Sequence, residues 1–239
     1  MIVEEYGSDQ EQILVLLHGA HMVHCFSGQY PLARRYHLLV PHLMGFGQEA
    51  GRVFDAESCV AELAEFIGGL QQKVLLVGFS LGAQLAYRLT LLHPELFSGV
   101  ILVSPWLIKE EASLRQIEEA NQKQLRFLQK TWVCRSFAAL NGIPKALRKD
   151  FCRQIQAETP ETIHNVVYNG IALDEKAARL RVPVIALAGE KEPEVMRRSV
   201  KALAEASPYC RYEIWKKAGH NIPMRFPDRF NQLLCETAK

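Results

Sequence analysis

Several short segments of the chain are almost entirely apolar, with no alternation between polar and apolar residues. Continuous apolar strands are typical of a parallel sheet that helices cover on both faces. Helical stretches separate these segments, and the repeated strand–helix–strand order predicts an α/β fold with a mostly parallel central sheet flanked by helices. The predicted strands are residues 2–6, 13–17, 37–40, 73–78, 99–103, 182–187 and 212–215.

The size and charge of the chain exclude several classes of protein. A length of 239 residues suits one domain with an insertion, and an apolar fraction of 49% is enough for a substantial core, which excludes global disorder. Lys and Arg number 28 against 26 for Asp and Glu, so the net charge of +2 lacks the basic excess of proteins that bind phosphate backbones. We therefore expect no nucleic-acid partner, and the sequence leaves the oligomeric state open.

The cysteine pattern and the N-terminal residues bear on the cellular compartment. The six cysteines are scattered without a C-x-x-C pair, as is typical of reduced thiols in the cytoplasm. The N-terminal segment lacks the basic and apolar regions of a signal peptide, and no apolar run approaches the roughly 18 residues of a membrane span. We expect a cytoplasmic protein with no membrane anchor.

One long segment interrupts the strand–helix order. Residues 111–140 contain no Gly or Pro, and their apolar residues recur at nearly helical spacing. Thr159, Pro160 and Glu161 have the pattern of an N-cap, a first-position proline and a first-turn acid, which predicts another helix start. We therefore expect a helical insertion over residues 107–180, between core segments 1–106 and 181–239.

The strongest chemical motif is Gly-Phe-Ser-Leu-Gly at residues 78–82, directly after an apolar strand and before a helical run. In this context G-x-S-x-G is a nucleophile elbow, a turn so tight that side chains at Gly78 and Gly82 would collide with neighbouring backbone. The turn holds its serine in a strained conformation with the hydroxyl exposed. The motif predicts Ser80 as a nucleophile, and the alternative is a serine that only caps the helix.

Five further segments occur in the same order as in the α/β-hydrolase family, so the chain resembles that family over nearly its whole length outside the insertion. The resemblance implies an α/β-hydrolase fold whose insertion is a helical cap. The segments are Leu-Leu-His-Gly at 16–19, a strand and loop at 36–47, a helix end and strand at 93–105, a strand and Gly-Glu-Lys-Glu-Pro loop at 182–193, and Ala-Gly-His-Asn at 218–221.

The resemblance implies a catalytic triad of Ser80, Glu192 and His220, in the family's order of nucleophile, acid and base. In this scheme His220 accepts the serine proton while Glu192 orients the imidazole and stabilises its charged form. The backbone amides of Ala20 and Leu81 would form the oxyanion hole. This chemistry needs no metal and no organic cofactor.

Two positions depart from the family pattern. The family usually has Asp where this chain has Glu192, and Glu190 and Glu194 remain alternatives for the acid. His42 replaces a usual Asp in a loop, where that Asp is generally structural. Some members place the acid at the position of Ser104, which cannot fill that role.

The expected reaction is hydrolysis of a small carboxylic ester, thioester or lactone through an acyl-serine intermediate, with a small-molecule acyl substrate. His21 is expected at the mouth of the pocket, and Trp132 and Phe137 of the insertion are candidates for its walls. His18 is expected to organise its loop by hydrogen bonds. The alternatives are a cofactor-free perhydrolase or acyltransferase with the same triad, and a non-enzymatic ligand receptor on the same fold.

Overall fold

A computed structural model describes residues 1–238 and contains a seven-stranded sheet in the order β1-β3-β2-β4-β5-β6-β7. β1 pairs antiparallel with β3, and every other neighbouring pair is parallel, which confirms the predicted α/β class. The strands are β1 (Val3–Tyr6), β2 (Ile13–Leu17), β3 (His37–Pro41), β4 (Val74–Phe79), β5 (Phe97–Val103), β6 (Val184–Gly189) and β7 (Cys210–Trp215).

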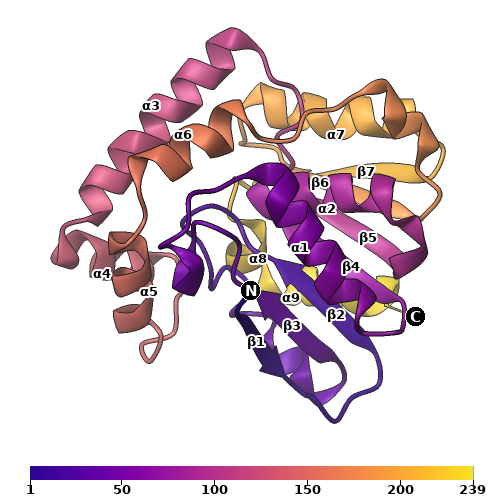
Figure 1. Ribbon diagram of the computed structural model, residues 1–239, viewed down its shortest axis with the longest axis horizontal. Coiled ribbons are helices and arrows are strands. Elements are labelled where there is room, and N and C mark those ends of the chain that lie inside the picture. Colours follow the sequence, from indigo (N-terminus) through magenta and orange to yellow (C-terminus); the bar gives the residue numbers. More distant parts are fainter. Residues whose placement is uncertain (239) are drawn as a thin grey trace.

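Helices flank this sheet. In Figure 1, α1 (Ala56–Gly68) and α2 (Leu81–Leu92) lie in front of the strands, and α9 (Pro227–Thr237) lies behind them. α7 (Glu194–Ala206) connects β6 to β7, and the short α8 (Ile222–Arg225) precedes α9. The start of α1 follows from its sequence, because the side chain of Asp55 accepts a hydrogen bond from the Ser58 amide at 2.8 Å, as an N-cap residue does.

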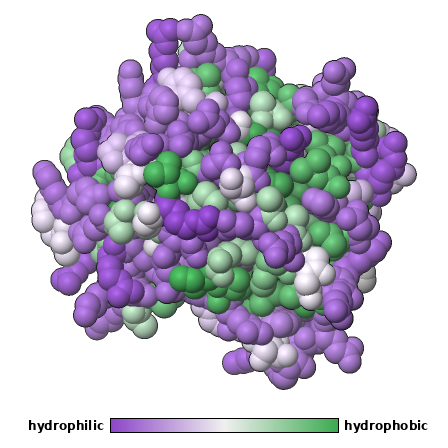
Figure 2. Space-filling view, in the orientation of Figure 1, coloured by the Kyte–Doolittle hydropathy of each residue, from purple (hydrophilic) through white to green (hydrophobic). Residues whose placement is uncertain are grey.

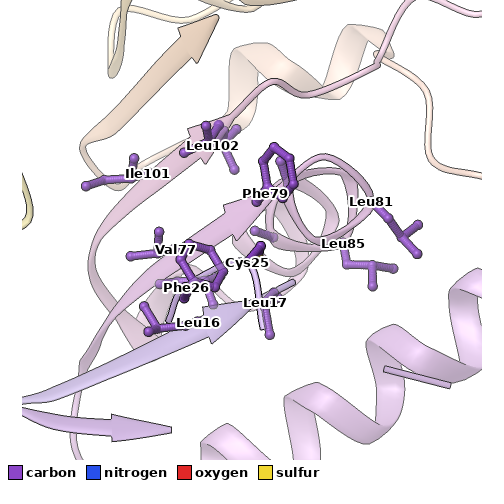
Figure 3. Close-up of a cluster of buried hydrophobic side chains, with 14 of the residues drawn as sticks. Leu16, Leu17, Cys25, Phe26, Val77, Phe79, Leu81, Leu85, Ile101 and Leu102 are labelled. Atoms are coloured by element: carbon purple, nitrogen blue, oxygen red, sulfur yellow. The ribbon is translucent and has the colours of Figure 1, made fainter. Parts of the chain in front are cut away.

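The central strands are buried from end to end. All five residues of β2 and all six of β4 are buried, as continuous apolar strands require when both faces are covered. Figure 3 shows the buried side chains of Leu16, Phe26 and Val77 close together, with Leu17 and Phe79 toward the ends of their strands. Burying one such side chain contributes about 1.5–3 kcal/mol. This packing fixes the strand ends from which the candidate site is built.

The insertion forms four α-helices, α3 (Glu111–Leu128), α4 (Thr131–Leu140), α5 (Arg148–Gln156) and α6 (Pro160–Tyr168), followed by a 3-10 helix over Glu175–Arg179. The predicted start of α6 is confirmed, because the Thr159 hydroxyl accepts a hydrogen bond from the Thr162 amide. Residues 111–140 form two helices separated at Gln129 and Lys130, although no Gly or Pro marks the break. Figure 1 gives the reason: α3 packs along α6, whereas α4 turns away to pack on α5.

The surface carries mixed side chains. In the view of Figure 2, hydrophilic residues predominate and hydrophobic groups lie between them. Across residues 1–238, no helix combines the length and the apolar character that crossing a membrane requires.

Candidate active site

Ser80 lies in the turn between β4 and α2, and its φ angle of +54° is in the left-handed region. Such a conformation costs an ordinary residue on the order of 1–3 kcal/mol and persists only where the surroundings enforce it. Both flanking glycines are required, because a Cβ atom at Gly78 would collide with the Gly82 carbonyl, and one at Gly82 with the Leu17 carbonyl. The turn therefore has the tight geometry that the G-x-S-x-G motif predicts.

The loops at the carboxyl ends of β4, β6 and β7 bring Ser80, Glu192 and His220 together. His220 Nε2 lies 3.0 Å from Ser80 Oγ, and His220 Nδ1 lies 2.6 Å from Glu192 Oε1. With its proton on Nδ1, the imidazole donates to Glu192 and accepts from the serine hydroxyl. Hydroxyl, imidazole and carboxylate in this order can transfer the serine proton to the imidazole during attack on a carbonyl.

The structure brings only one of the three candidate carboxylates to His220. Glu192 is 3% exposed, whereas Glu190 and Glu194 are exposed. A carboxylate oxygen of Glu190 instead accepts a hydrogen bond from the Lys217 amide, at 2.8 Å. Glu194 begins α7.

Ser104, at the end of β5, supports the longer side chain of Glu192, a role that the sequence did not reveal. The Oε2 atom of Glu192 accepts hydrogen bonds from the Ser104 hydroxyl at 3.0 Å and from the Gly189 amide at 2.6 Å. Its Oε1 atom is thereby left for His220. The only signal in the sequence was that some family members place their acid at the position of Ser104.

The loop after β2 lies directly beside the elbow. A Cβ atom added to Gly19 would lie 3.2 Å from the Ser80 Cβ atom, and the Gly82 amide donates to the His18 carbonyl at 3.1 Å. Within residues 1–238, neither the Ala20 amide nor the Leu81 amide donates a hydrogen bond to the protein. Both amides are therefore free to donate to an oxygen bound near Ser80.

His18 holds this loop in place. Its Nδ1 atom lies 2.8 Å from the Gly19 carbonyl oxygen, and its Nε2 atom accepts a hydrogen bond from the Leu43 amide at 3.0 Å. Burial is the main reason that the pKa of His18 falls to about 3, so the ring is neutral at neutral pH. The neutral tautomer with its proton on Nδ1 satisfies both hydrogen bonds.

The residues predicted to line the pocket lie in different surroundings. His21 is 2% exposed and is hydrogen-bonded to Glu158 in the connection between α5 and α6. Phe137 stacks on Phe151 within the insertion, with ring centroids 6.3 Å apart, and Trp132 is 72% exposed. Neither Phe137 nor Trp132 belongs to the hydrogen-bonded group around Ser80, and their contact with substrate stays a prediction.

Whether the described residues, 1–238, meet the requirements of a metal site depends on the side chains that they bring together. Among residues 1–238, no three His, Cys, Asp or Glu side chains are grouped so that they could hold a metal ion. The histidines near the site, such as His18 and His21, instead make hydrogen bonds within the protein.

The chain is similar to several esterases in sequence or in fold. Pimeloyl-[acyl-carrier protein] methyl ester esterase of Aeromonas hydrophila is 28% identical over an alignment 258 positions long, which covers 97% of this chain and 96% of the relative. Two esterase structures share the fold: that from Thermogutta terrifontis has a TM-score of 0.72 at 21% identity and covers 98% of this chain and 91% of its own. The esterase from Exiguobacterium antarcticum has a TM-score of 0.75 at 17% identity, with coverage of 99% and 94%.

A family profile gives the decisive match. It is that of the Alpha/beta hydrolase family, and it spans residues 14–233, a range that includes the elbow, the loop after β6 and the loop after β7. The chain therefore belongs to the alpha/beta hydrolase family.

Proposed function

We propose that this protein is a serine hydrolase that cleaves a small carboxylic ester, thioester or lactone through an acyl-serine intermediate. The observation that carries the proposal is the hydrogen-bonded series from Ser80 Oγ through His220 to Glu192. The esterase activity named for the Aeromonas relative supports the same class of substrate.

The reaction proceeds in two halves. His220 Nε2 takes the proton of Ser80 as Oγ bonds to the acyl carbon, and it returns that proton to the leaving alcohol, thiol or ring oxygen. Water then attacks the acyl-serine and gives a proton to His220, and His220 returns that proton to Ser80 Oγ as the acyl–Oγ bond breaks and the acid leaves. Glu192 orients the imidazole and stabilises its charged form.

The amides of Ala20 and Leu81 act on the negative oxygen that develops during each half. A correctly placed donor of this kind contributes about 3 kcal/mol to transition-state stabilisation. Leu81 suits the role because it is the first residue of α2, where the positive end of the helix dipole also favours an anion.

The insertion, residues 107–180, is proposed to act as the cap over Ser80 and to set the shape of the acyl pocket. Its contacts reach the site itself: Asn221, the residue after His220, donates a hydrogen bond to Asn141 Oδ1 at 2.9 Å. Asn141 directly follows α4, so this bond ties the second helix of the insertion to the loop of the proposed base.

A fluorophosphonate probe tests the proposal directly. It should label the wild-type protein once, at Ser80, as located by peptide mass mapping. Labelling should be absent in Ser80→Ala and unchanged in Ser136→Ala, which removes an exposed hydroxyl from α4. A wild-type protein that is not labelled and does not cleave p-nitrophenyl esters would contradict the proposal. Acyl transfer to peroxide or an alcohol in preference to water would instead identify a perhydrolase or acyltransferase.

A further inference from the structure

A buried hydrogen bond joins the loop beside Ser80 to the insertion. His21 immediately follows Ala20 in the loop after β2, and Glu158 lies in the connection between α5 and α6. His21 Nδ1 is hydrogen-bonded to Glu158 Oε2, and the two side chains are only 3% and 0% exposed. The pair therefore links the sheet core to the insertion. Its core member, His21, is the residue next to Ala20, whose amide is a proposed oxyanion donor.

The backbone of His21 needs such a restraint. Its φ angle is +60°, in the left-handed region that residues other than Gly, Asn and Asp rarely adopt. The Met22 amide closes the same turn by donating to the Gly19 carbonyl at 3.2 Å, so Ala20 lies inside it. A change in the conformation of His21 would disturb this turn and would therefore shift Ala20, whose amide is one peptide group away from His21.

A contribution to the stability of the fold does not by itself explain why His21 and Glu158 are paired. His21 Nε2 and Glu158 Oε1 are buried without a hydrogen-bond partner in the described residues. Burial also raises the pKa of Glu158, while the nearby His21 opposes that rise. A buried ionisable pair with unsatisfied atoms is often no more stabilising than an apolar pair of similar volume. The pair is better explained by where it holds the loop.

We propose that His21 and Glu158 are a positioning pair, which keeps the Ala20 amide aimed at the oxyanion only while the insertion is seated on the core. The inference rests on the proposed function, because an oxyanion forms only if Ser80 attacks a carbonyl. Glu158 acts through His21 and is not itself a catalytic residue. Since the oxyanion exists in the transition state and not in bound substrate, loss of the pair should lower kcat and leave KM nearly unchanged.

Substitutions at Glu158 test the hydrogen bond. Glu158→Ala should lower kcat by about 10- to 100-fold. This decrease is no larger than the one caused by removing an oxyanion donor altogether. Glu158→Gln keeps a hydrogen-bonding oxygen in the same volume and should recover most of that loss. The matched control is Glu118→Ala, which breaks another His–Glu contact, the 2.7 Å contact of Glu118 with His164, inside the insertion and near its surface. This control should stay within twofold of wild type.

Substitutions at His21 separate the backbone from the side chain. Asn tolerates positive φ and carries a hydrogen-bond donor, so His21→Asn should retain more activity than His21→Ala. His21→Gly removes the strain and the hydrogen bond together. If the pair positions the loop, His21→Gly is impaired as Glu158→Ala is, and the double variant is no worse than either single one, because both remove the same interaction.

Hydrogen exchange supplies a readout that does not depend on the reaction. Amides of residues 19–24 should exchange faster in Glu158→Ala than in wild type, and no faster in Glu118→Ala. Faster exchange together with a lower kcat at unchanged KM supports the proposal. Unchanged exchange, or a change confined to thermal stability and KM, overturns it. If the wild-type protein is not labelled by the fluorophosphonate, the proposed function fails, and exchange alone then decides whether the pair positions the loop.

Discussion

The strands of the sheet core and the longest helix of the insertion differ in how much of their length is buried. In β4 all six residues are buried, whereas α3 buries only Leu125 and Leu128 of its 18 residues. Apolar residues of the insertion such as Ile163 belong to the same buried cluster as the strands, and polar contacts near the site add to this, namely those of Asn141 with Asn221 and of Glu158 with His21. The core therefore carries the three residues of the proposed triad, while the insertion reaches the loops beside them through a few side-chain contacts.

The largest loss of activity is expected when the proposed nucleophile, which the sheet core carries, is removed. Ser80→Ala should reduce ester turnover by on the order of 10⁶-fold, as the loss of a triad nucleophile does in serine proteases. The fold should persist, because a single oxygen is removed and no apolar packing changes. Steady-state kinetics and circular dichroism check this. Residual activity above a few per cent would exclude Ser80 as the nucleophile.

The acid gives the next largest effect. Glu192→Gln should lower turnover by about 10²- to 10⁴-fold, because the amide keeps the shape but cannot stabilise the imidazolium. The matched controls Glu190→Gln and Glu194→Gln should remain within a few-fold of wild type, since both side chains are exposed. Kinetics of the three purified variants decide the matter. If Glu190→Gln is the variant that loses activity, or if all three variants remain active, Glu192 is not the acid of the triad.

Acid should destabilise the core through its buried histidines. Burial lowers the pKa of His18 from 6.5 to about 3 and lowers that of His24 as well, so the unfolded chain binds protons that the folded one does not. Stability is therefore greatest well above pH 6.5 and falls below it, with a slope that approaches about 1.4 kcal/mol per pH unit for His18, and His24 acts in the same direction.

Urea unfolding at pH 7.5, 6.5 and 5.5 measures this slope. His164→Gln, in the insertion and 55% exposed at its side chain, should leave the slope unchanged. An unfolding free energy that stays constant down to pH 5.5 would show that these histidines accept protons in the folded core.

The smallest effect is expected from the insertion, which should set the preference of the protein for the length of the acyl chain. If Phe137 bounds the acyl pocket, each added methylene improves kcat/KM by up to about 0.8 kcal/mol until the space is filled. Phe137→Ala should then move the optimum to longer acyl chains, and Trp132→Ala tests the exposed indole in the same way. A series of p-nitrophenyl esters measures the profile. A flat profile, or one that neither substitution alters, would contradict an acyl pocket bounded by α4.

The sequence by itself determined the strands, the elbow and the order of the motifs, because these depend on neighbouring residues. Burial of a parallel strand requires a continuous apolar run, so the predicted strand over residues 13–17 coincides with β2. The G-x-S-x-G turn is equally local, since its glycines avoid collisions within a few residues of Ser80.

Only the tertiary structure decided how distant parts of the chain complete the candidate site. Ser104 meets Glu192 across 88 residues of sequence, and His21 meets Glu158 across 137. The break between α3 and α4 likewise follows from packing on α6 and α5 and not from a local signal. Contacts of this kind depend on how the strands are ordered and how the insertion lies on them, and no pattern of neighbouring residues encodes that arrangement.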